Sequence, residues 1–410
     1  MARVNENFLK LNGGYLFPEV ARRTKAWSEK NKGVEILRLG IGNTTEALTP
    51  SIADAMKHKV DLLKSRDTYT GYGDEQGDTA LRVALSKFYK SEYGVDLSDS
   101  EFFVSDGAKS DAANIQDVFS RDSIVAVQDP AYPVYVDSNV VGGRTQGFDS
   151  EASNYRGLVY MRADESNGFV AEPPKQHVDL MYLCFPNNPT GAVATKDQLK
   201  AFVDYALREK AIIIYDAAYC DYIRHEGIPR TIYEVEGAKE CAIEINSFSK
   251  NAGFTGVRLG WSVVPAGLES ENAPKGTIHS IWNRRQCTFF NGASNIAQAG
   301  GLQALSPEGR KECRSLVDYY LGNASIIREG FSKAGLKCFG GTDSPYIWTK
   351  CPNGMKSWDF FDYILDKAHV VVTPGSGFGS AGEGFVRVSA YNHRENVEAA
   401  VRSIVENLNG

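Results

Sequence analysis

The residues best suited to chemistry lie in one glycine-rich stretch, Ser247–Gly260. It contains Lys250, two serines just before it (Ser247 and Ser249) and an arginine eight residues later, Arg258. A lysine with a lowered pKa can form an imine with an aldehyde, and serines together with a bidentate arginine can bind a phosphate. The combination predicts a phosphorylated aldehyde, and pyridoxal 5'-phosphate (PLP) is the commonest cofactor of that kind. Taken alone, the stretch also fits a solvated surface loop.

Length and composition describe an ordinary globular protein. The 410 residues suffice for two domains and a large core, and the 42% hydrophobic and 23% charged residues lie in the usual range. The net charge of −6 provides no basic surface for nucleic acid or an anionic membrane. The seven cysteines are odd in number and form no C-x-x-C pair, and the six histidines have no metal-ligand spacing. The sequence therefore predicts no disulfide framework, no metal site and a reducing compartment.

The amino-terminal residues favour a cytoplasmic location. Met1–Lys10 contain neither the apolar core of a signal peptide nor an Arg/Ser-rich presequence, although the mature form of a plastid protein would also fit. The longest strongly apolar run, residues 211–214, is too short to cross a bilayer. We therefore expect small-molecule substrates, and neither a nucleic acid nor a membrane as a partner.

Short apolar runs that alternate with amphipathic segments predict an α/β fold. Continuous apolar strands are expected at residues 102–104, 124–127, 180–183, 211–215 and 242–245. Such strands are buried on both faces, so the central sheet should be mostly parallel and covered by helices on both sides. Helices are expected at 51–64, around Leu81–Phe88, from Ala108 to Phe119, and at 198–207, 294–305 and 308–334. We expect an N-terminal arm that runs into a strand and joins a small domain (1–48), a large cofactor-binding domain (49–300) and a small α+β domain (301–410).

Ligands of open α/β sheets bind outside the carboxyl ends of the strands, and several predicted strands end in unusual residues. Ala108 and Lys109 begin a helix whose free amide groups suit a phosphate, although Asp106 as an ordinary helix cap is the simpler explanation of that motif alone. Tyr132 lies in a rigid loop between two prolines. Its ring could stack on a planar cofactor or pack in the core.

Two further strand ends carry polar groups. Asn188 lies in a Pro-Asn-Asn-Pro segment, which could aim a donor into a cleft or form a plain turn. Asp216 ends a very apolar strand, where a carboxylate is costly unless it pairs with a cation. The protonated pyridine nitrogen of PLP would serve, and the pair would keep the ring an electron sink. Tyr219, three residues later, could reach the ring hydroxyl.

These five stretches, in this order, resemble the fold-type I PLP-dependent aminotransferases of classes I and II over nearly the whole chain. The resemblance implies that Lys250 binds PLP as an imine and later moves a proton, that Asp216 pairs with the pyridine nitrogen, and that Tyr132 stacks on the ring. Asn188, in preference to Asn187, and Tyr219 would contact the ring hydroxyl. The phosphate would be held by Ala108, Lys109, Ser247, Ser249 and Arg258. The resemblance also implies a homodimer with shared active sites, in which Tyr72 reaches the phosphate of the neighbouring subunit.

One arginine near the C-terminus has two interpretations. Arg387 lies inside a short apolar strand, where a buried structural ion pair would explain it. The resemblance instead implies that Arg387 binds the α-carboxylate of the substrate, assisted by the backbone of Gly42.

A finer resemblance is to the LL-diaminopimelate aminotransferase family, through residues 5–17, 71–77, 105–109 and 287–301. It implies reversible amino transfer between LL-diaminopimelate and 2-oxoglutarate, giving tetrahydrodipicolinate and L-glutamate, in lysine biosynthesis. The substrate would contact Tyr15, Gly42, Glu75, Lys109, Tyr132, Asn188, Asn291 and Arg387. Asp74 departs from the proline common in that family and adds a negative charge beside Glu75.

Other functions of the same fold stay open from the sequence. An aromatic or aspartate aminotransferase is the closest alternative, and a PLP-dependent C–S lyase or a cyclase would use the same lysine. A non-catalytic effector-binding domain of a transcription regulator would carry a basic DNA-binding module, and this chain shows none.

Overall fold

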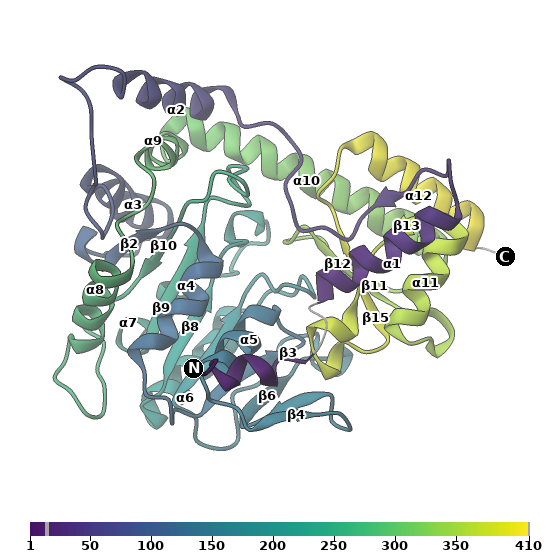
Figure 1. Ribbon diagram of the computed structural model, residues 1–410, viewed down its shortest axis with the longest axis horizontal. Helices are drawn as coiled ribbons and strands as arrows, with labels where there is room; N and C mark the ends of the chain where they lie inside the picture. The colour runs from purple at the N-terminus through teal and green to yellow at the C-terminus, as the bar shows by residue number, and fades with distance from the viewer. Residues whose placement is uncertain (13–15, 409–410) are drawn as a thin grey trace.

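The computed structural model describes residues 1–12 and 16–408. Its centre is a seven-stranded sheet in the order β2-β10-β9-β8-β7-β3-β6 (Figure 1). The strands are β2 (Phe102–Ser105), β3 (Val125–Asp129), β6 (Leu158–Arg162), β7 (Leu180–Cys184), β8 (Ile212–Asp216), β9 (Ala242–Ser247) and β10 (Gly260–Val263). Neighbouring strands run parallel except at β10, which is antiparallel to both β2 and β9. The predicted mostly parallel α/β sheet is therefore confirmed.

The side chains of each central strand alternate between two cores, because successive residues of a strand point to opposite faces. In β8, Ile213 and Tyr215 pack on one face, and Ile212 and Ile214 pack on the other. The first face is covered by α3 (Thr79–Tyr93), α6 (Lys196–Glu209) and α9 (Asn295–Ala304). The second face is covered by α4 (Ala108–Asn114), α5 (Pro133–Val141) and α8 (Thr277–Phe289).

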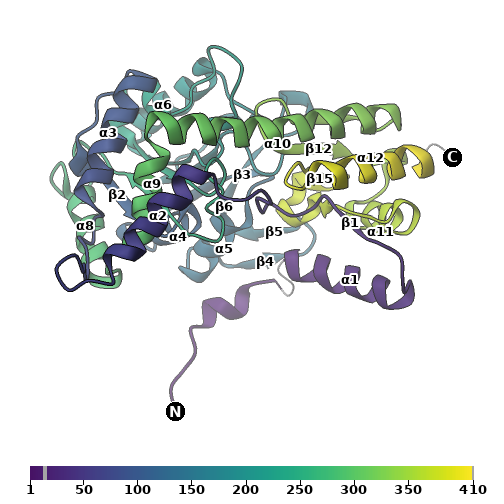
Figure 2. The same cartoon turned by 90° about the horizontal axis from the view of Figure 1, so that it is seen from above.

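A smaller antiparallel sheet lies at the other end of the molecule, with the order β11-β12-β15-β14 (Figure 1). Its strands are β11 (Cys338–Gly340), β12 (Tyr346–Lys350), β14 (Thr373–Pro374) and β15 (Phe385–Ser389). The 27-residue helix α10 (Pro307–Lys333) runs from the large sheet to this one (Figures 1 and 2). The remaining helices of this end are α1 (Leu16–Lys30), α11 (Ser357–Ala368) and α12 (Arg394–Leu408).

The N-terminal segments contact both the end with the smaller sheet and the end with the large sheet. The short strand β1 (Leu37–Arg38) pairs in parallel with β13 (Val370–Val371), beside the smaller sheet. Residues 6–10 form a 3₁₀ helix whose Lys10 ammonium donates a 3.0 Å hydrogen bond to the Thr145 carbonyl at the other end. Figure 2 shows residues 1–5 extending away from the body of the molecule. The predicted arm thus contains the regular helix α1, which the sequence did not indicate.

Several other elements were not predicted: β6, β10, α5, α8, and the hairpin β4 (Gly147–Asp149) and β5 (Asn154–Arg156). The helix expected from Ala108 to Phe119 ends at Asn114 and continues as a 3₁₀ helix, Ile115–Val118. The predicted helix at 51–64 is α2 (Pro50–Leu62), and the short α7 (Ala238–Cys241) precedes β9. Within residues 1–12 and 16–408, no helix is long and apolar enough to cross a membrane.

Candidate active site

A cavity of about 330 Å³ lies at the carboxyl ends of the parallel strands and extends to β12 and β15 of the smaller sheet. Twelve of the sixteen residues proposed for the site from the sequence line it: Gly42, Ala108, Lys109, Tyr132, Asn188, Asp216, Tyr219, Ser247, Ser249, Lys250, Arg258 and Arg387. They come from segments more than 300 residues apart in the chain. The fold therefore collects nearly all the strand-end motifs in one place.

Lys250 follows β9 and points its ammonium into the cavity, where it donates a hydrogen bond to the Gly42 carbonyl. The Nζ atom lies 5.3 Å from the centroid of the Tyr391 ring and 6.0 Å from that of Tyr219. Burial, together with the nearby positive charges of Arg387 and Arg258, lowers the pKa of Lys250 to about 7. An amine with such a pKa is largely neutral, and therefore nucleophilic, just above neutral pH.

Asp216 ends β8 and is 8% exposed. Its Oδ2 accepts a 2.7 Å hydrogen bond from the Tyr135 hydroxyl, and its Oδ1 accepts a 3.0 Å hydrogen bond from the Ala218 amide. Burial raises the pKa of the Asp216 carboxyl, and the two hydrogen bonds oppose that change. A cationic group in the cavity would stabilise the ionised carboxylate, as the sequence argument requires.

The opposite end of the cavity gathers hydrogen-bond donors. The Ser247 hydroxyl lies 2.8 Å from the Ser249 hydroxyl, and the Arg258 guanidinium lies 3.5 Å from Ser249 Oγ. These groups face the beginning of α4, which follows Gly107. Gly107 has φ +134°, and a Cβ there would lie 2.5 Å from an Arg258 nitrogen. Only glycine fits this approach, which leaves the first amides of α4 and the guanidinium side by side.

The first turn of α4 is held from inside by a buried carboxyl group. The Ser105 hydroxyl donates a 2.7 Å hydrogen bond to Asp111 Oδ2 and accepts a 3.2 Å bond from the Gly107 amide. Burial raises the pKa of Asp111 to about 8. Asp111 is a supporting residue that the sequence did not single out.

The two adjacent asparagines have different surroundings. The Asn187 side chain is used within its turn, where its Oδ1 accepts hydrogen bonds from the amide and the hydroxyl of Thr190 at 3.1 and 3.0 Å. The Asn188 side chain lines the cavity, and its Oδ1 accepts a 2.7 Å hydrogen bond from Arg387. Asn188 is thus the asparagine available to a ligand, in keeping with the choice made from the sequence.

Arg387 is 1% exposed in β15. Its Nη2 donates a 2.9 Å hydrogen bond to the Gly40 carbonyl, and its Nε has no hydrogen-bond partner among the described residues. Aromatic rings surround it, with the Tyr346 centroid at 4.5 Å and the Phe378 centroid at 5.0 Å. No carboxylate of residues 1–12 or 16–408 pairs with it, so the structural ion pair considered from the sequence is not formed among them. A buried guanidinium without a counter-ion suits an anionic ligand.

Three proposed residues lie outside this cavity. Tyr72, Glu75 and Asn291 do not line the cavity, and Tyr72 is 88% exposed. The loop at 71–75 packs instead on the segment beginning at Asn291. The two backbones are so close that a Cβ on Gly292 would lie 2.8 Å from the Asp74 carbonyl oxygen. The Asn295 amide also donates a 2.9 Å hydrogen bond to the Gly71 carbonyl. Tyr15 lies outside the described residues.

The structure also adds residues that sequence reasoning missed. Tyr135, Tyr346 and Phe17 line the cavity, and the Tyr346 hydroxyl lies 2.9 Å from the Tyr219 hydroxyl. Tyr135 could have been found, because it is three residues after Tyr132 in a helix that begins at Pro133. Tyr346 gave no local signal, since only the pairing of β12 with β15 brings it beside Arg387.

The donor set fits PLP: a lysine of lowered pKa, a carboxylate at the end of β8, and a cluster of phosphate-binding groups line one cavity. The glycine cradle between α4 and Arg258 fits the phosphate in particular, because nothing larger than glycine would leave room there. Among the described residues, no group of three histidine, cysteine or acidic side chains could hold a metal ion.

Comparisons with known proteins agree with this site. Residues 34–404 match the family Aminotransferase class I and II. The chain is 49% identical, over 99% of its length and 100% of the relative, to the LL-diaminopimelate aminotransferase of Prochlorococcus marinus (strain MIT 9515). The structure of L,L-diaminopimelate aminotransferase from Chlamydomonas reinhardtii matches with a TM-score of 0.93 and 49% identity, covering 99% of this chain and 98% of that one.

A more distant structure supports the fold alone. An aspartate aminotransferase of Thermus thermophilus matches with a TM-score of 0.84 at 22% identity, covering 99% of this chain and 100% of that one. The family match and the full-length relatives lead to one conclusion: the chain belongs to the aminotransferase class I and II family, whose enzymes depend on PLP.

Proposed function

We propose that this enzyme interconverts LL-2,6-diaminopimelate and 2-oxoglutarate with tetrahydrodipicolinate and L-glutamate, as a step of lysine biosynthesis. The observation that carries the proposal is the 49% identity to an LL-diaminopimelate aminotransferase over the full length of both chains. The cavity agrees with it, since it combines a nucleophilic lysine with a buried arginine that pairs with no carboxylate in the described part of the chain. The aspartate and aromatic aminotransferases of similar fold are far less alike in sequence, at 22% and 24% identity.

We assign roles to the cofactor-binding residues from the family resemblance, and their positions in one cavity support the assignment. Lys250 would hold the cofactor covalently through Nζ, and Asp216 would pair with the ring nitrogen. The phosphate would be held by Ala108, Lys109, Ser247, Ser249 and Arg258, and the ring hydroxyl by Asn188 and Tyr219. Tyr132, which precedes α5 and lines the cavity, would stack on the ring. When bound, PLP supplies an electron sink for negative charge at the α-carbon of the amino acid.

Lys250 transfers the proton that leaves and returns to the α-carbon of the amino acid. Its pKa of about 7 allows Nζ to accept a proton from the α-carbon and to return it near neutral pH. The rings of Tyr219 and Tyr391 surround Nζ and restrict its access to water. The same amine therefore serves as base and as acid in the two directions of the reaction.

Arg387 orients the substrate. Its buried guanidinium binds the α-carboxylate, and the backbone of Gly42 lies beside it. A Cβ at position 42 would lie 2.6 Å from the Tyr346 hydroxyl, so a side chain there would close this part of the cavity. The α-amino group is thereby directed towards Lys250.

The distal end of the substrate meets a second subunit in this proposal. Tyr72, Glu75 and Asn291 lie together on the surface, away from the Lys250 of their own chain. The N-terminal residues also expose apolar side chains, with Val4 70%, Phe8 56% and Leu9 74% exposed. A homodimer would cover these residues and bring the loop at 71–75 into the partner's cavity.

We place the enzyme in the cytoplasm, or in a plastid in its mature form.

The function is tested by adding single amino acids to the purified holoenzyme and following the cofactor absorbance. LL-diaminopimelate and L-glutamate should convert the cofactor to its aminated form, whereas L-aspartate and L-phenylalanine should not. Preference for aspartate or phenylalanine would overturn the proposed substrate while leaving the family assignment intact. Release of ammonia and pyruvate from a cysteine conjugate would indicate a C–S lyase instead.

A further inference from the structure

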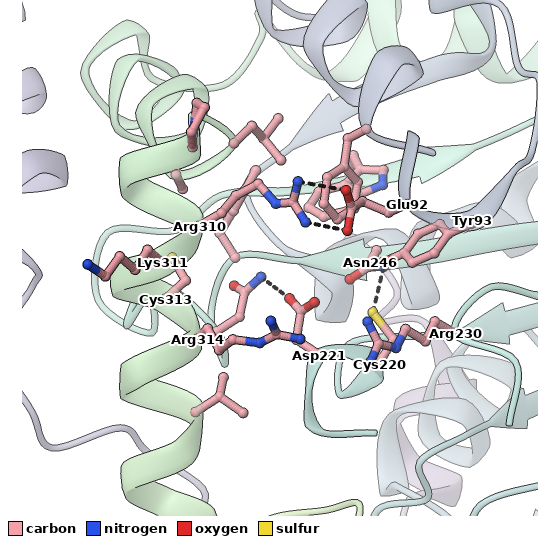
Figure 3. A pocket seen from close by; sticks show the side chains of 18 of the residues that line it. Glu92, Tyr93, Cys220, Asp221, Arg230, Asn246, Arg310, Lys311, Cys313 and Arg314 are labelled. Carbon is pink, nitrogen blue, oxygen red and sulfur yellow. Dashed lines mark hydrogen bonds and ion pairs between the residues drawn. The ribbon is translucent and has the colours of Figure 1, made fainter. Parts of the chain in front are cut away.

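A second cavity, of about 400 Å³, lies behind the Lys250 segment (Figure 3). It is bounded by the end of α3, by the 3₁₀ helix Cys220–Tyr222, by Trp261 of β10 and by the first half of α10. Its volume is in the range of small-molecule sites in proteins. None of the described residues proposed for amino transfer lines it.

A single layer of backbone separates this cavity from the active site. Ser247, Ser249 and Lys250 line the active-site cavity, whereas their neighbours Asn246, Phe248 and Asn251 line the second one. Likewise, Tyr219 lines the active-site cavity, and its neighbour Cys220 lines the second one. The Tyr222 hydroxyl, on the boundary, donates a 3.0 Å hydrogen bond to the Lys250 carbonyl.

The inner wall of the second cavity is aromatic. The rings of Phe248 and Trp261 pack with their centroids 4.8 Å apart. Phe88 and Tyr93 of α3 make a second ring pair, with centroids 5.3 Å apart and nearly perpendicular planes. Leu305 and Val317 complete an apolar surface that suits a flat hydrocarbon body.

The outer wall carries an excess of positive charge. Figure 3 shows Arg310 and Arg314 extending from α10 into the cavity, with Arg230 opposite. Glu92 pairs with Arg310 at 2.7 Å, and Asp221 accepts a hydrogen bond from the Asn251 amide. Arg224, which pairs with Asp318, and Lys311 also line the cavity, so four guanidinium groups and one ammonium face these two carboxylates.

One of these guanidinium groups is available to a ligand. No hydrogen bond or ion pair links the Arg314 side chain to any other residue in the described part of the chain. The side-chain oxygen of Asn251 is buried and has no hydrogen-bond partner among the same residues. Lys311, between the two arginines in sequence, also lines the cavity, but its ammonium points away from Arg310 and Arg314 (Figure 3).

We propose that this cavity is a second binding site, for an organic anion with a flat apolar body, such as an aromatic carboxylate or sulfonate. The flat body of the ligand packs against the aromatic wall, and Arg314 binds its anionic group. Arg230 adds positive charge on the opposite side of the cavity. An inorganic anion would leave the apolar wall unfilled, and a neutral aromatic compound would leave Arg314 unpaired.

The test measures binding of naphthalene-1-sulfonate to the holoenzyme by titration calorimetry. Naphthalene-1-sulfonamide, which has the same body without the charge, is the control ligand. Arg314→Gln should weaken binding of the sulfonate about tenfold or more, the loss expected for one charge-assisted hydrogen bond, and should leave the sulfonamide unchanged. Lys311→Gln removes one positive charge from the same helix at an ammonium that points away from Arg314, so it should change the binding of either ligand much less than Arg314→Gln does.

Two results would overturn the proposal. The first is sulfonate binding that is absent, or equal in the wild type, Arg314→Gln and Lys311→Gln. The second is binding that Arg387→Gln abolishes, because that residue lines only the active-site cavity and its loss would place the probe there. A thermal unfolding curve for each variant distinguishes a lost contact from a lost fold.

Discussion

The Tyr135 hydroxyl donates a 2.7 Å hydrogen bond to Asp216 Oδ2, from the first turn of α5 to the end of β8. Both residues are buried, with 1% and 8% of their surfaces exposed. Burial raises the pKa of the Tyr135 phenol well above its ordinary value, so the hydroxyl stays protonated and remains a donor. Tyr135 therefore fixes the orientation of the carboxylate and opposes its protonation.

Replacing Tyr135 with phenylalanine should raise the pKa of Asp216 and lower kcat for both half-reactions. The loss of one hydrogen bond to a charged group corresponds to about 1.5–3 kcal/mol, or roughly 10- to 150-fold. Single-turnover kinetics as a function of pH would measure both effects, with the largest loss at the lowest pH. Tyr182→Phe is the matched control, because its ring stacks on Tyr135 and its hydroxyl donates a 3.2 Å hydrogen bond to the Ala112 carbonyl and none to Asp216 among the described residues. Equal losses in the two variants would contradict the assigned role.

Uptake of PLP by the cofactor-free enzyme should depend on the protonation of Lys250. With a pKa of about 7, the neutral fraction of the amine rises from about one tenth at pH 6 to about nine tenths at pH 8. The rate of cofactor attachment, followed by absorbance, should therefore rise about tenfold over that interval. Arg387→Gln should move the midpoint to higher pH, since the arginine charge lowers the pKa of Lys250. A midpoint near 10 in the wild type would refute the lowered pKa.

The site of attachment can be tested chemically. Borohydride reduction of the holoenzyme followed by peptide mapping should place the pyridoxyl group on Lys250. Lys109 also lines the cavity, so it is the informative competitor. A label on Lys109 would reassign the covalent residue within the same cavity.

The part of the cavity formed by the large sheet was predictable, because each of its motifs lies at the end of a strand. The runs before Asp216 and Ser247 are continuous and apolar, and both form buried parallel strands in the structure. Parallel strands bring their carboxyl ends to one edge, so motifs far apart in sequence could be placed together without knowing the strand order. The same reasoning placed Asn188 after β7.

The parts that were missed depend on tertiary pairing. The four residues of β10 contain a glycine and a serine and carry no periodic signal, yet this strand lies between β2 and β9 and sets the position of Arg258. Helix α8 buries only Ile278, Trp282 and Gln286 of its 13 residues, which is too sparse a pattern to read from the sequence. The contact of Tyr346 with Tyr219 depends on the smaller sheet meeting the larger one.

Mixing two inactive variants tests the shared active site. Lys250→Ala lacks the covalent residue, and Tyr72→Phe lacks the hydroxyl that we assign to the partner's phosphate site. Refolded together, they form mixed dimers in which one of two sites is intact, so about a quarter of wild-type activity should return. Each variant refolded alone provides the baseline. Full activity in a monomer, measured with light scattering at assay concentration, would exclude a shared site.

Glu75 should set the substrate and leave the chemistry intact. It lies beside exposed Asp74 in a loop that packs on Gly292, outside the cavity of its own chain. In the proposed dimer, its carboxylate meets the distal ammonium of diaminopimelate, whereas glutamate carries no charge there to pair. Glu75→Gln keeps the shape and removes the charge. The diaminopimelate half-reaction should lose about 2–4 kcal/mol, or roughly 30- to 1,000-fold in kcat/KM, and the glutamate half-reaction should change little.

Asp74→Asn is the matched control for Glu75→Gln, because it removes the adjacent charge of the same loop. An exposed carboxylate is well screened by water, so this change should cost either half-reaction less than about 1 kcal/mol. Single-turnover spectroscopy separates the two half-reactions for both variants. If Glu75→Gln slows diaminopimelate and glutamate equally, the residue supports the cofactor site and does not recognise the distal ammonium. If Asp74→Asn alone slows diaminopimelate, the recognition belongs to the residue that replaces the proline common in the family.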